Sequence, residues 1–200
     1  MARERMSKHM KVTAFNGSPR ENGNTALMLR KALEPIAAAG IETEFVQVGG
    51  TDIHGCRSCM ECAKRKDRHC VFNDDMLNTF LDKMLQSDGI LLGSPSYFSS
   101  VTPELKALMD RAGFVAVVNG GLLARKVGAG VAVHRRGGGV NVMDTINHMF
   151  LMSRMIVPGS TYWNFGVGRE PGDVANDAEA LANMKDLGET FVWLLGRIVA

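Results

Sequence analysis

KVTAFNGSPRENGNTALMLRKALEPIAAA, residues 11–39, joins a short β-rich run to an amphipathic segment through a loop of turn-forming residues. The run 11–16 has the composition of a strand and ends at a glycine. Residues 24–39 carry apolar side chains at helical spacing, and Gly40 follows them as a stop signal. A strand, a loop and a helix in this order predict the first unit of an α/β fold.

The rest of the chain repeats this alternation. Short apolar runs predict strands, and longer segments with apolar residues at helical spacing predict helices. The expected strands cover residues 41–48, 89–93, 127–133 and 160–163, and the expected helices cover 74–86, 103–118, 140–157 and 177–199. Five strands that alternate with five helices predict one α/β domain, residues 11–200, with a parallel sheet and right-handed crossovers. Residues 1–10 are expected to be an N-terminal extension.

The loop after the first strand, residues 17–25, has the composition of an anion site. The hydroxyls of Ser18 and Thr25, the backbone N–H groups and the start of the following helix can surround a phosphate. The loop lacks the Gly-Lys-Ser/Thr ending of a Walker loop and the G-x-G-x-x-G dinucleotide fingerprint. It therefore predicts a site for a terminal monophosphate such as that of FMN, and the alternative is a turn without a ligand.

Two further loops follow expected strands. Residues 93–103, GSPSYFSSVTP, place Tyr97 and Phe98 in a hydroxyl-rich loop that suits a flat ring with polar edges. Residues 134–139, HRRGGG, allow close backbone approach at the glycines, and the arginines and helix start suit negative charge on a reduced flavin. Since open parallel sheets bind ligands at the carboxyl ends of their strands, both loops are candidates for one site. A solvent-exposed turn is the alternative for residues 134–139.

All four cysteines of the chain, Cys56, Cys59, Cys62 and Cys70, lie in one short stretch. Their C-x2-C-x2-C-x7-C spacing is typical of ligands to a single [4Fe-4S] cluster, whereas zinc sites more often use two separated pairs. Basic residues between the third and fourth cysteines would offset thiolate charge. A zinc site, a metal-free thiol loop and a disulfide pair remain alternatives. The stretch predicts a cysteine-rich insertion at residues 54–73, after the second strand.

Bulk composition favours an ordinary intracellular protein. The 200 residues are 46% hydrophobic and 22% charged, with a net charge of +2, which favours neither a nucleic-acid nor a membrane partner. The first ten residues are polar and basic, so no secretory signal is expected. A cytoplasmic location follows from that expectation. Because the cytoplasm is reducing, metal or redox roles for the cysteines are favoured over a disulfide framework.

The loop sequences GSPRENGNT and SPSYFSSVTPELKALMDR together resemble the NADPH-dependent FMN reductases of flavodoxin-like fold. The added cysteine pattern resembles the iron–sulfur flavoproteins within that family. The resemblance covers roughly residues 10–200. It implies a flavodoxin-like three-layer sandwich whose five-stranded parallel sheet has the order 2-1-3-4-5. It also implies FMN at the point where the strand order reverses, and a homodimer or homotetramer with the flavin near a subunit interface.

Residues of all three loops are the expected cofactor ligands. By the resemblance the first loop would hold the phosphate and the second would contact the ribityl chain and the isoalloxazine. The expected FMN-binding residues are Ser18, Arg20, Asn22, Gly23, Asn24, Thr25, Pro95, Ser96, Tyr97, Phe98, Ser99, Arg136, Gly137 and Gly138, and the expected cluster ligands are the four cysteines. Ser99 departs from the family pattern, which often has glycine there. Hydride transfer to flavin N5 requires no side-chain acid or base, so no catalytic residue is expected.

These features predict an oxidoreductase that pairs FMN with a [4Fe-4S] cluster, so that two electrons accepted by the flavin can pass singly to the cluster or return from it. The alternatives are an NAD(P)H-dependent FMN or quinone reductase without a cluster, and a non-catalytic flavodoxin-like electron carrier. The expected donor is NAD(P)H or a ferredoxin-like protein, and the acceptor a small molecule or a protein. The helix 140–157 is apolar around most of its girth, which predicts burial against both the sheet and a second subunit.

Overall fold

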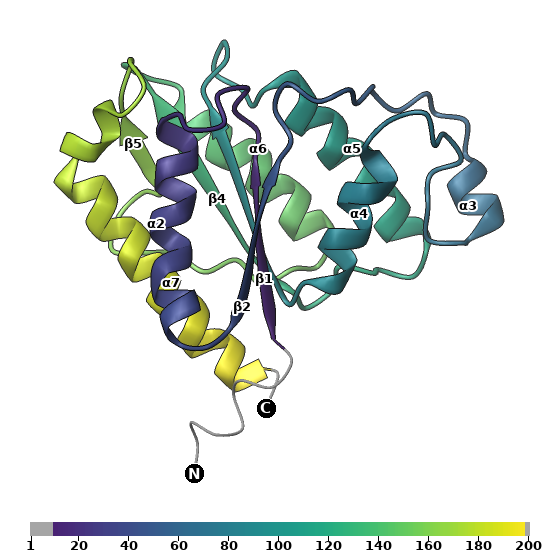
Figure 1. The fold of residues 1–200 in the computed structure, drawn as a ribbon. Coiled ribbons are helices and arrows are strands. Elements are labelled where there is room, and N and C mark those ends of the chain that lie inside the picture. The colour runs from purple at the N-terminus through teal and green to yellow at the C-terminus, as the bar shows by residue number, and fades with distance from the viewer. Residues whose placement is uncertain (1–9, 199–200) are drawn as a thin grey trace.

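A five-stranded parallel sheet of order β2-β1-β3-β4-β5 lies at the centre of the structure, a computed structural model that describes residues 10–198 (Figure 1). Every neighbouring pair of strands is parallel. The strands are β1 (Lys11–Asn16), β2 (Glu42–Gln47), β3 (Gly89–Pro95), β4 (Val127–His134) and β5 (Phe165–Val167). The predicted sheet order is therefore confirmed, and the order reverses between β1 and β3.

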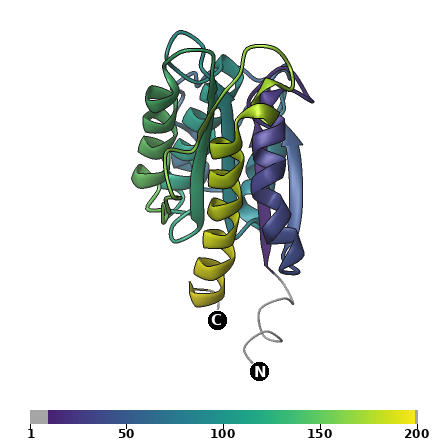
Figure 2. The ribbon, with the colours of Figure 1, turned by 90° about the vertical axis from the view of Figure 1, so that its left-hand side faces the viewer.

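Helices cover both faces of this sheet. One face carries α2 (Asn24–Ala38) and α7 (Ala178–Ile198), and the other carries α4 (Leu77–Gln86), α5 (Pro103–Val118) and α6 (Gly139–Met152) (Figures 1 and 2). The short helix α3 (Glu61–Arg65) lies outside these layers, beside α5. The three-layer arrangement of the prediction is thus present.

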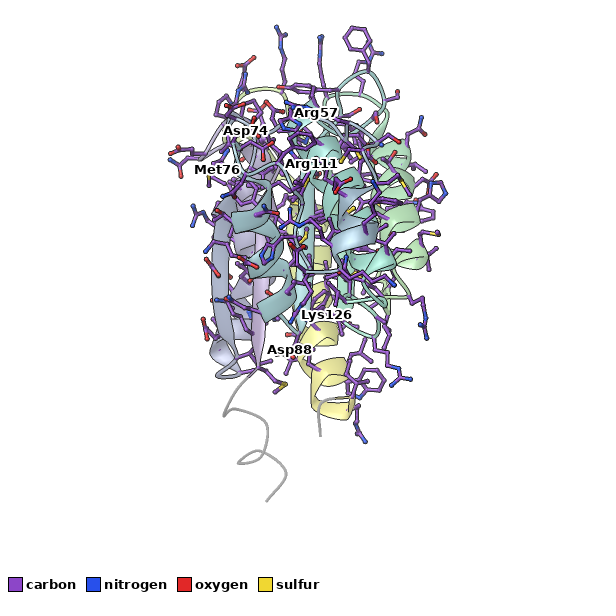
Figure 3. The ribbon with its side chains drawn as sticks, turned by 90° about the vertical axis from the view of Figure 1, so that its right-hand side faces the viewer. Arg57, Asp74, Met76, Asp88, Arg111 and Lys126 are labelled. Atoms are coloured by element: carbon purple, nitrogen blue, oxygen red, sulfur yellow. The ribbon has the colours of Figure 1, made fainter. Side chains whose placement is uncertain are left out.

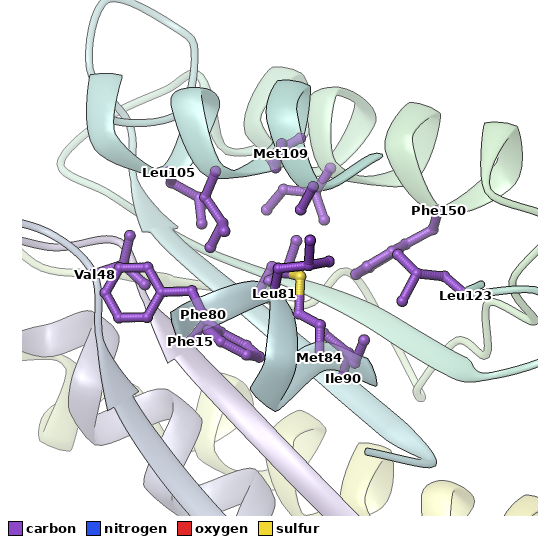
Figure 4. Close-up of a cluster of buried hydrophobic side chains, with 14 of the residues drawn as sticks. Phe15, Val48, Phe80, Leu81, Met84, Ile90, Leu105, Met109, Leu123 and Phe150 are labelled. Atoms are coloured by element: carbon purple, nitrogen blue, oxygen red, sulfur yellow. The ribbon is translucent and has the colours of Figure 1, made fainter. Parts of the chain in front are cut away.

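Two hydrophobic cores lie on opposite faces of the sheet, because successive side chains of a strand point to opposite sides. Phe15 packs among side chains of α4 and α5, whereas its neighbour Ala14 packs toward α2 and α7 (Figure 4). Ile90 and Leu91 of β3 divide in the same way. A strand buried on both faces reads as a continuous apolar run, which is why β3 and β4 are visible in the sequence.

The α2–α7 layer depends on one close approach. A Cβ at Gly188 of α7 would lie 2.3 Å from the carbonyl oxygen of Ala32 and 2.4 Å from Cγ of Pro35 in α2. Only a residue without a side chain leaves room for the two helices at this spacing. Gly188 is itself buried in this crossing, in the interior of α7.

Two predicted boundaries near α6 are wrong. The helix expected over 140–157 ends at Met152, because Arg154 takes a left-handed conformation with φ 60°. The N–H groups of Arg154 and Met155 then donate to the carbonyls of Leu151 and Phe150, which is a Schellman ending with arginine in the usual glycine position. The strand expected over 160–163 is a bend without strand structure, and β5 begins only at Phe165.

Other boundaries shift by a few residues. The helix expected to begin at residue 74 begins at Leu77, and α3 was not expected at all. Met10 is no part of an extension: it is buried, and its carbonyl accepts the N–H of Glu42 at 3.1 Å. The remainder of the predicted extension, residues 1–9, and the last residue of the predicted helix 177–199 lie outside the described residues.

Candidate functional site

The three predicted ligand loops meet at the carboxyl edge of the sheet, at the top of Figure 1. The hydroxyl of Thr102, at the end of the second loop, donates to the carbonyl of Gly17 in the first loop at 2.7 Å. Gly138 of the third loop lies against the second, since a Cβ there would be 2.3 Å from Oγ of Ser96. The fold therefore brings together the three segments that the sequence singled out separately.

The first loop presents donors for an anion. The backbone N–H groups of Asn24, Thr25 and Ala26 begin α2 and have no acceptor among the described residues, and no side chain caps this helix. Ser18 and Thr25 are 5% and 2% exposed, and Oγ of Ser18 accepts the N–H of Arg20 at 3.2 Å within the loop. Uncapped N–H groups beside buried hydroxyls form the arrangement that binds a phosphate.

Two amide side chains from neighbouring strands hold this loop in place. Asn16 at the end of β1 accepts the N–H of Ser18 at 3.2 Å and donates to Oε1 of Gln47 at 2.7 Å. Gln47 at the end of β2 donates in turn to the carbonyl of Ser18 at 2.7 Å and to that of Gly49 at 2.6 Å. The loop conformation is thus fixed by side chains outside it, and sequence reasoning missed both of them.

Asn24, expected to hold the phosphate, uses its side chain elsewhere. Its Nδ2 donates to the carbonyl of Glu170 at 2.9 Å, and its Oδ1 accepts the N–H of Gly172 at 2.8 Å. Arg20 also reaches the same region, with Nη1 3.4 Å from the carbonyl oxygen of Arg169. The Asn24 amide therefore fixes the loop between β5 and α7 over the start of α2, and only its backbone N–H remains for an anion.

The second loop contains a tight turn with two strained residues. Tyr97 and Ser100 exchange backbone hydrogen bonds of 2.9 and 3.0 Å, and between them Phe98 and Ser99 have φ values of 48° and 62°. The Phe98 side chain is fully exposed. A bulky residue in the left-handed region without burial has no local stabilisation, so a ligand is the natural partner for this ring.

The third loop leaves space beside that turn. Arg136 and Gly137 are exposed, and no atom lies within 4 Å of where a Cβ of Gly137 would be. His134 precedes the loop, and its ring contacts that of Phe165 edge-on at 4.9 Å. Burial lowers the pKa of His134, and the charge of Asp177 opposes this only in part. The loop thus has an open backbone on one side and a neutral, packed imidazole on the other.

The cysteine segment is a separate part of the same edge. Cys56, Cys59, Cys62 and Cys70 are free thiols that line one hollow together with Arg111. Cys56 and Cys59 are exposed, whereas Cys62 is buried, and burial raises the pKa of its thiol. The hollow is further lined by Phe72 and Phe114, so it is apolar around the sulfur atoms.

The four thiols offer the donor set of an iron–sulfur cluster. Within residues 10–198, no three His, Cys, Asp or Glu side chains stand close enough to hold one metal ion. A [4Fe-4S] cluster takes one thiolate at each of four irons, so its ligands stand farther apart than those around a single ion. Four thiols around one hollow, with none in a disulfide, fit that donor set.

Side chains of helix α5 and of the residue after it form hydrogen bonds with the cysteine segment. Arg111 is 2% exposed and donates to the carbonyl of His54 at 3.0 Å and to Sγ of Cys70 at 3.4 Å, besides forming an ion pair with Asp75. Figure 3 labels Arg111 below Arg57 and Asp74, at the end of the molecule where the loops gather.

Asn119, directly after the last residue of α5, accepts the N–H of Arg68 at 3.1 Å and donates to the carbonyl of Cys62 at 3.3 Å. The side chain of Asp75 is 1% exposed. Burial opposes its ionisation, but hydrogen bonds from Arg111 and from the N–H groups of His54 and Leu77 outweigh it and keep its pKa below the usual range.

Comparison with solved structures gives the class of protein. The chain superposes on a flavodoxin-like, WrbA-like protein from Agrobacterium tumefaciens with a TM-score of 0.65, over 95% of this chain and 99% of that one, at 11% identity. The five-stranded parallel sheet and its strand order agree with this likeness. The protein is therefore a flavodoxin-like α/β protein.

Comparison of sequences gives the family. A family model described as NADPH-dependent FMN reductase matches residues 10–170. An iron–sulfur flavoprotein of Methanocaldococcus jannaschii is 41% identical over 90% of this chain and 94% of its own length. One of Methanosarcina thermophila is 32% identical over 90% of this chain and 91% of its own length. The chain belongs to the NADPH-dependent FMN reductase family, and the expectation of an FMN-dependent oxidoreductase is confirmed at that level.

Proposed function

We propose that this protein is an electron-transfer flavoprotein that binds FMN in its three loops and a [4Fe-4S] cluster on Cys56, Cys59, Cys62 and Cys70. The observation that carries the proposal is the gathering of all four thiols around one hollow at the edge of the sheet that also bears the flavin loops. The names of the two relatives support it. We further propose NAD(P)H or a ferredoxin-like protein as the electron donor, and a small molecule or a protein as the acceptor.

The chain's own residues would bind and orient these groups. The N–H groups at the start of α2 and the hydroxyls of Ser18 and Thr25 would hold the phosphate. The turn at Phe98 would contact the ring on one side, and the open backbone at Gly137 on the other. Bound FMN would supply both two-electron and one-electron chemistry, and a cluster one-electron chemistry.

Helix α5 links the two sites. Its first turn follows the flavin loop directly, and Arg111 stands eight residues after Pro103. At 1.5 Å per residue this separation is about 12 Å along the helix axis. The first half of this sixteen-residue helix therefore spans from the flavin loop to the cysteine segment, which supports direct electron exchange between them.

Iron content tests the proposal. Anaerobically reconstituted protein should contain about four irons per chain. Cys59→Ala should lose the iron and its broad visible absorbance but keep FMN, because the flavin loops are separate from the cysteines. Cys59→Ser controls for the size of the side chain and should also lose iron. Less than about one iron per chain in the wild type contradicts the cluster and leaves the FMN or quinone reductase as the function.

Turnover distinguishes the reductase from a carrier. Steady oxidation of NAD(P)H with a quinone or free FMN as acceptor is expected of an oxidoreductase of this family. Reduction of the bound flavin by a donor without multiple turnover would instead support the flavodoxin-like carrier.

The phosphate site has its own test. Thr25→Ala should weaken FMN binding about tenfold or more, since one hydrogen bond to a charged group contributes roughly 1.5–3 kcal/mol. Thr25→Ser keeps the hydroxyl and should bind nearly as well as the wild type. Equal affinity of the alanine variant in a flavin fluorescence titration would place the phosphate elsewhere.

We also propose that a second copy of the chain covers α6. Leu151 and Met152 at its end are 62% and 71% exposed, and Phe114 and Met149 line a groove between α5 and α6. Apolar side chains of this size in one region favour an interface. A homodimer or homotetramer is therefore the proposed assembly.

A cytoplasmic location completes the proposal. No helix within residues 10–198 has the length and apolar character to cross a membrane. The four thiols are free, which agrees with a reducing compartment.

A further inference from the structure

A buried arginine contacts the cysteine segment at two points. Nη1 of Arg111 donates to the carbonyl of His54 at 3.0 Å, and Nη2 lies 3.4 Å from Sγ of Cys70. These two contacts bind the segment near both of its ends. The partner of Arg111 is Asp75, whose carboxylate also accepts the N–H of His54 at 3.0 Å and that of Leu77 at 3.1 Å.

A buried guanidinium at this place costs desolvation energy that must be recovered by its contacts. Arg111 lies eight residues after Pro103, where the second flavin loop ends. The hydrogen bonds of Arg111 and Asp75 nevertheless go to each other and to His54, Cys70 and Leu77, none of which would hold FMN. Replacing such a pair by apolar residues is often neutral for stability, so a role in holding a thiolate explains its position better than stability does.

We propose that Arg111 is a positioning residue of the cysteine site: it holds Cys70 in place as the fourth ligand and favours the more negative, reduced state of a bound cluster. The proposal rests on the cluster of the proposed function. An N–H group directed at a ligand sulfur, and a positive charge beside it, stabilise added negative charge and thereby raise the reduction potential of a cluster.

We expect Asp75 to shift the reduction potential of the cluster in the direction opposite to Arg111. Its carboxylate pairs with Nη1 of Arg111, whereas Sγ of Cys70 lies at Nη2, so the carboxylate compensates part of the positive charge at Cys70. Removing the carboxylate charge should therefore raise the potential, whereas removing the guanidinium should lower it. Opposite shifts from two partners of one ion pair are a signature that a merely loosened segment would not give.

The experiment uses four variants of the full chain, each checked for retained FMN as a measure of folding. Redox titration of the reconstituted protein should show a lower cluster potential for Arg111→Met and a higher one for Asp75→Asn. Arg111→Lys keeps the charge and should lie between the wild type and Arg111→Met. Lys106→Met removes an exposed cation from the same helix, 48% exposed and paired with Asp110, and should leave the potential unchanged.

A second readout needs no iron. The segment holds exposed trypsin sites at residues 57, 64–66 and 68. In metal-free protein, Arg111→Met should be cleaved there about tenfold faster or more, because a lost hydrogen bond from a charged group shifts local opening by at least that factor. Lys106→Met should be cleaved at the wild-type rate.

The outcomes separate this proposal from the function on which it rests. A wild type that binds no iron contradicts the cluster, and an unchanged cleavage rate of Arg111→Met then overturns the holding role of Arg111 as well. A wild type that binds iron while the Arg111 and Asp75 variants shift the potential in the same direction, or not at all, overturns the proposal and leaves the cluster intact.

Discussion

Strained residues mark both candidate loops. Among the described residues, eight residues other than glycine have a positive φ, and six of them lie in the cysteine segment or in the second loop. These six are Ser58, Met60, Lys66, Arg68, Phe98 and Ser99. Left-handed residues with side chains cost roughly 1–2 kcal/mol each. Such strain persists where the surroundings or a ligand hold it, and this agrees with a binding role for both loops.

Phe98→Asn should therefore stabilise the protein and weaken its flavin site. Asparagine tolerates the left-handed turn, so the free energy of unfolding should rise by about 1 kcal/mol. Loss of the ring should weaken FMN binding about threefold to tenfold if the aromatic contact contributes its usual 0.5–1.5 kcal/mol. Urea unfolding of the FMN-free protein and flavin titration measure the two effects.

Arg125→Asn is the matched control. Arg125 is exposed, has a φ of 68° and precedes β4, at the sheet edge opposite the loops. It should gain similar stability and keep full FMN affinity. A Phe98 variant that bound FMN as tightly as the wild type would show that its ring makes no contact with the flavin.

The partly buried imidazole of His134 predicts a pH dependence. Because burial lowers its pKa, the unfolded chain binds a proton below about pH 6.5 that the folded state takes up only at lower pH. Stability is then fully present above about pH 6.5 and falls as the solution is acidified through the folded pKa. His134→Gln should flatten this part of the stability curve, measured by urea unfolding between about pH 5 and 7.5.

A control exchange at an exposed histidine, His148→Gln, should leave the contribution of His134 in place. If the His134 variant kept the whole acid dependence of the wild type, the dependence would belong to other groups. The pKa of His134 would then play no part in it.

At the scale of elements, we expect alanine substitutions at two helical glycines to have opposite effects on stability. The lack of a side chain at Gly188 allows α7 to cross closely over α2. A Cβ at Gly113 in α5 would meet only Met149, at 3.6 Å. Gly188→Ala should destabilise the protein by about 1–3 kcal/mol through overpacking, despite the better helix propensity of alanine. Gly113→Ala should stabilise it by about 1 kcal/mol.

Thermal unfolding of the two alanine variants at one protein concentration checks this pair. Equal effects of the two exchanges, in either direction, would contradict the role of Gly188 in the helix crossing.

The sequence predicts elements well where a long periodic pattern exists. Helix α5 and strand β1 have the predicted bounds, because each lies between strong boundary residues and its pattern runs without interruption. The end of α6 was missed because arginine occupies the left-handed position where glycine would have signalled a stop. Strand β5 has only three residues, and the apolar pair Tyr162–Trp163 just before it carries a stronger strand signal than β5 itself.

The meeting of the three candidate loops was predictable to a similar degree, and for a physical reason. Each loop directly follows a parallel strand, so all three lie at one edge of the sheet, and their composition reveals them as candidates. The residues that hold those loops come from distant parts of the chain: Gln47 is 29 residues from Ser18, Thr102 is 85 from Gly17 and Arg111 is 41 from Cys70. No local pattern connects such pairs, and only the fold brings them together.

For the whole molecule, the exposed end of α6 predicts an assembly. Light scattering at micromolar concentration should give at least a dimer. Met152→Glu places a charge in the proposed interface and should shift the protein toward a monomer. Trp193→Glu on α7, where the side chain is 61% exposed, should leave the assembly unchanged. A monomeric wild type would contradict the proposed interface.

The contacts between α5 and the cysteine segment also have a consequence for the order in which the protein folds and takes up its proposed cluster. The cysteines are synthesised before β3, and Arg111 and Asn119 follow later still. At about 5–20 residues per second, synthesis from Asn16 to Gly89 alone takes roughly 4–15 s, during which one edge of β1 lacks its partner strand. The nascent cysteine segment has nothing to pack against in this interval, so we expect loading of the proposed cluster to follow closure of the sheet.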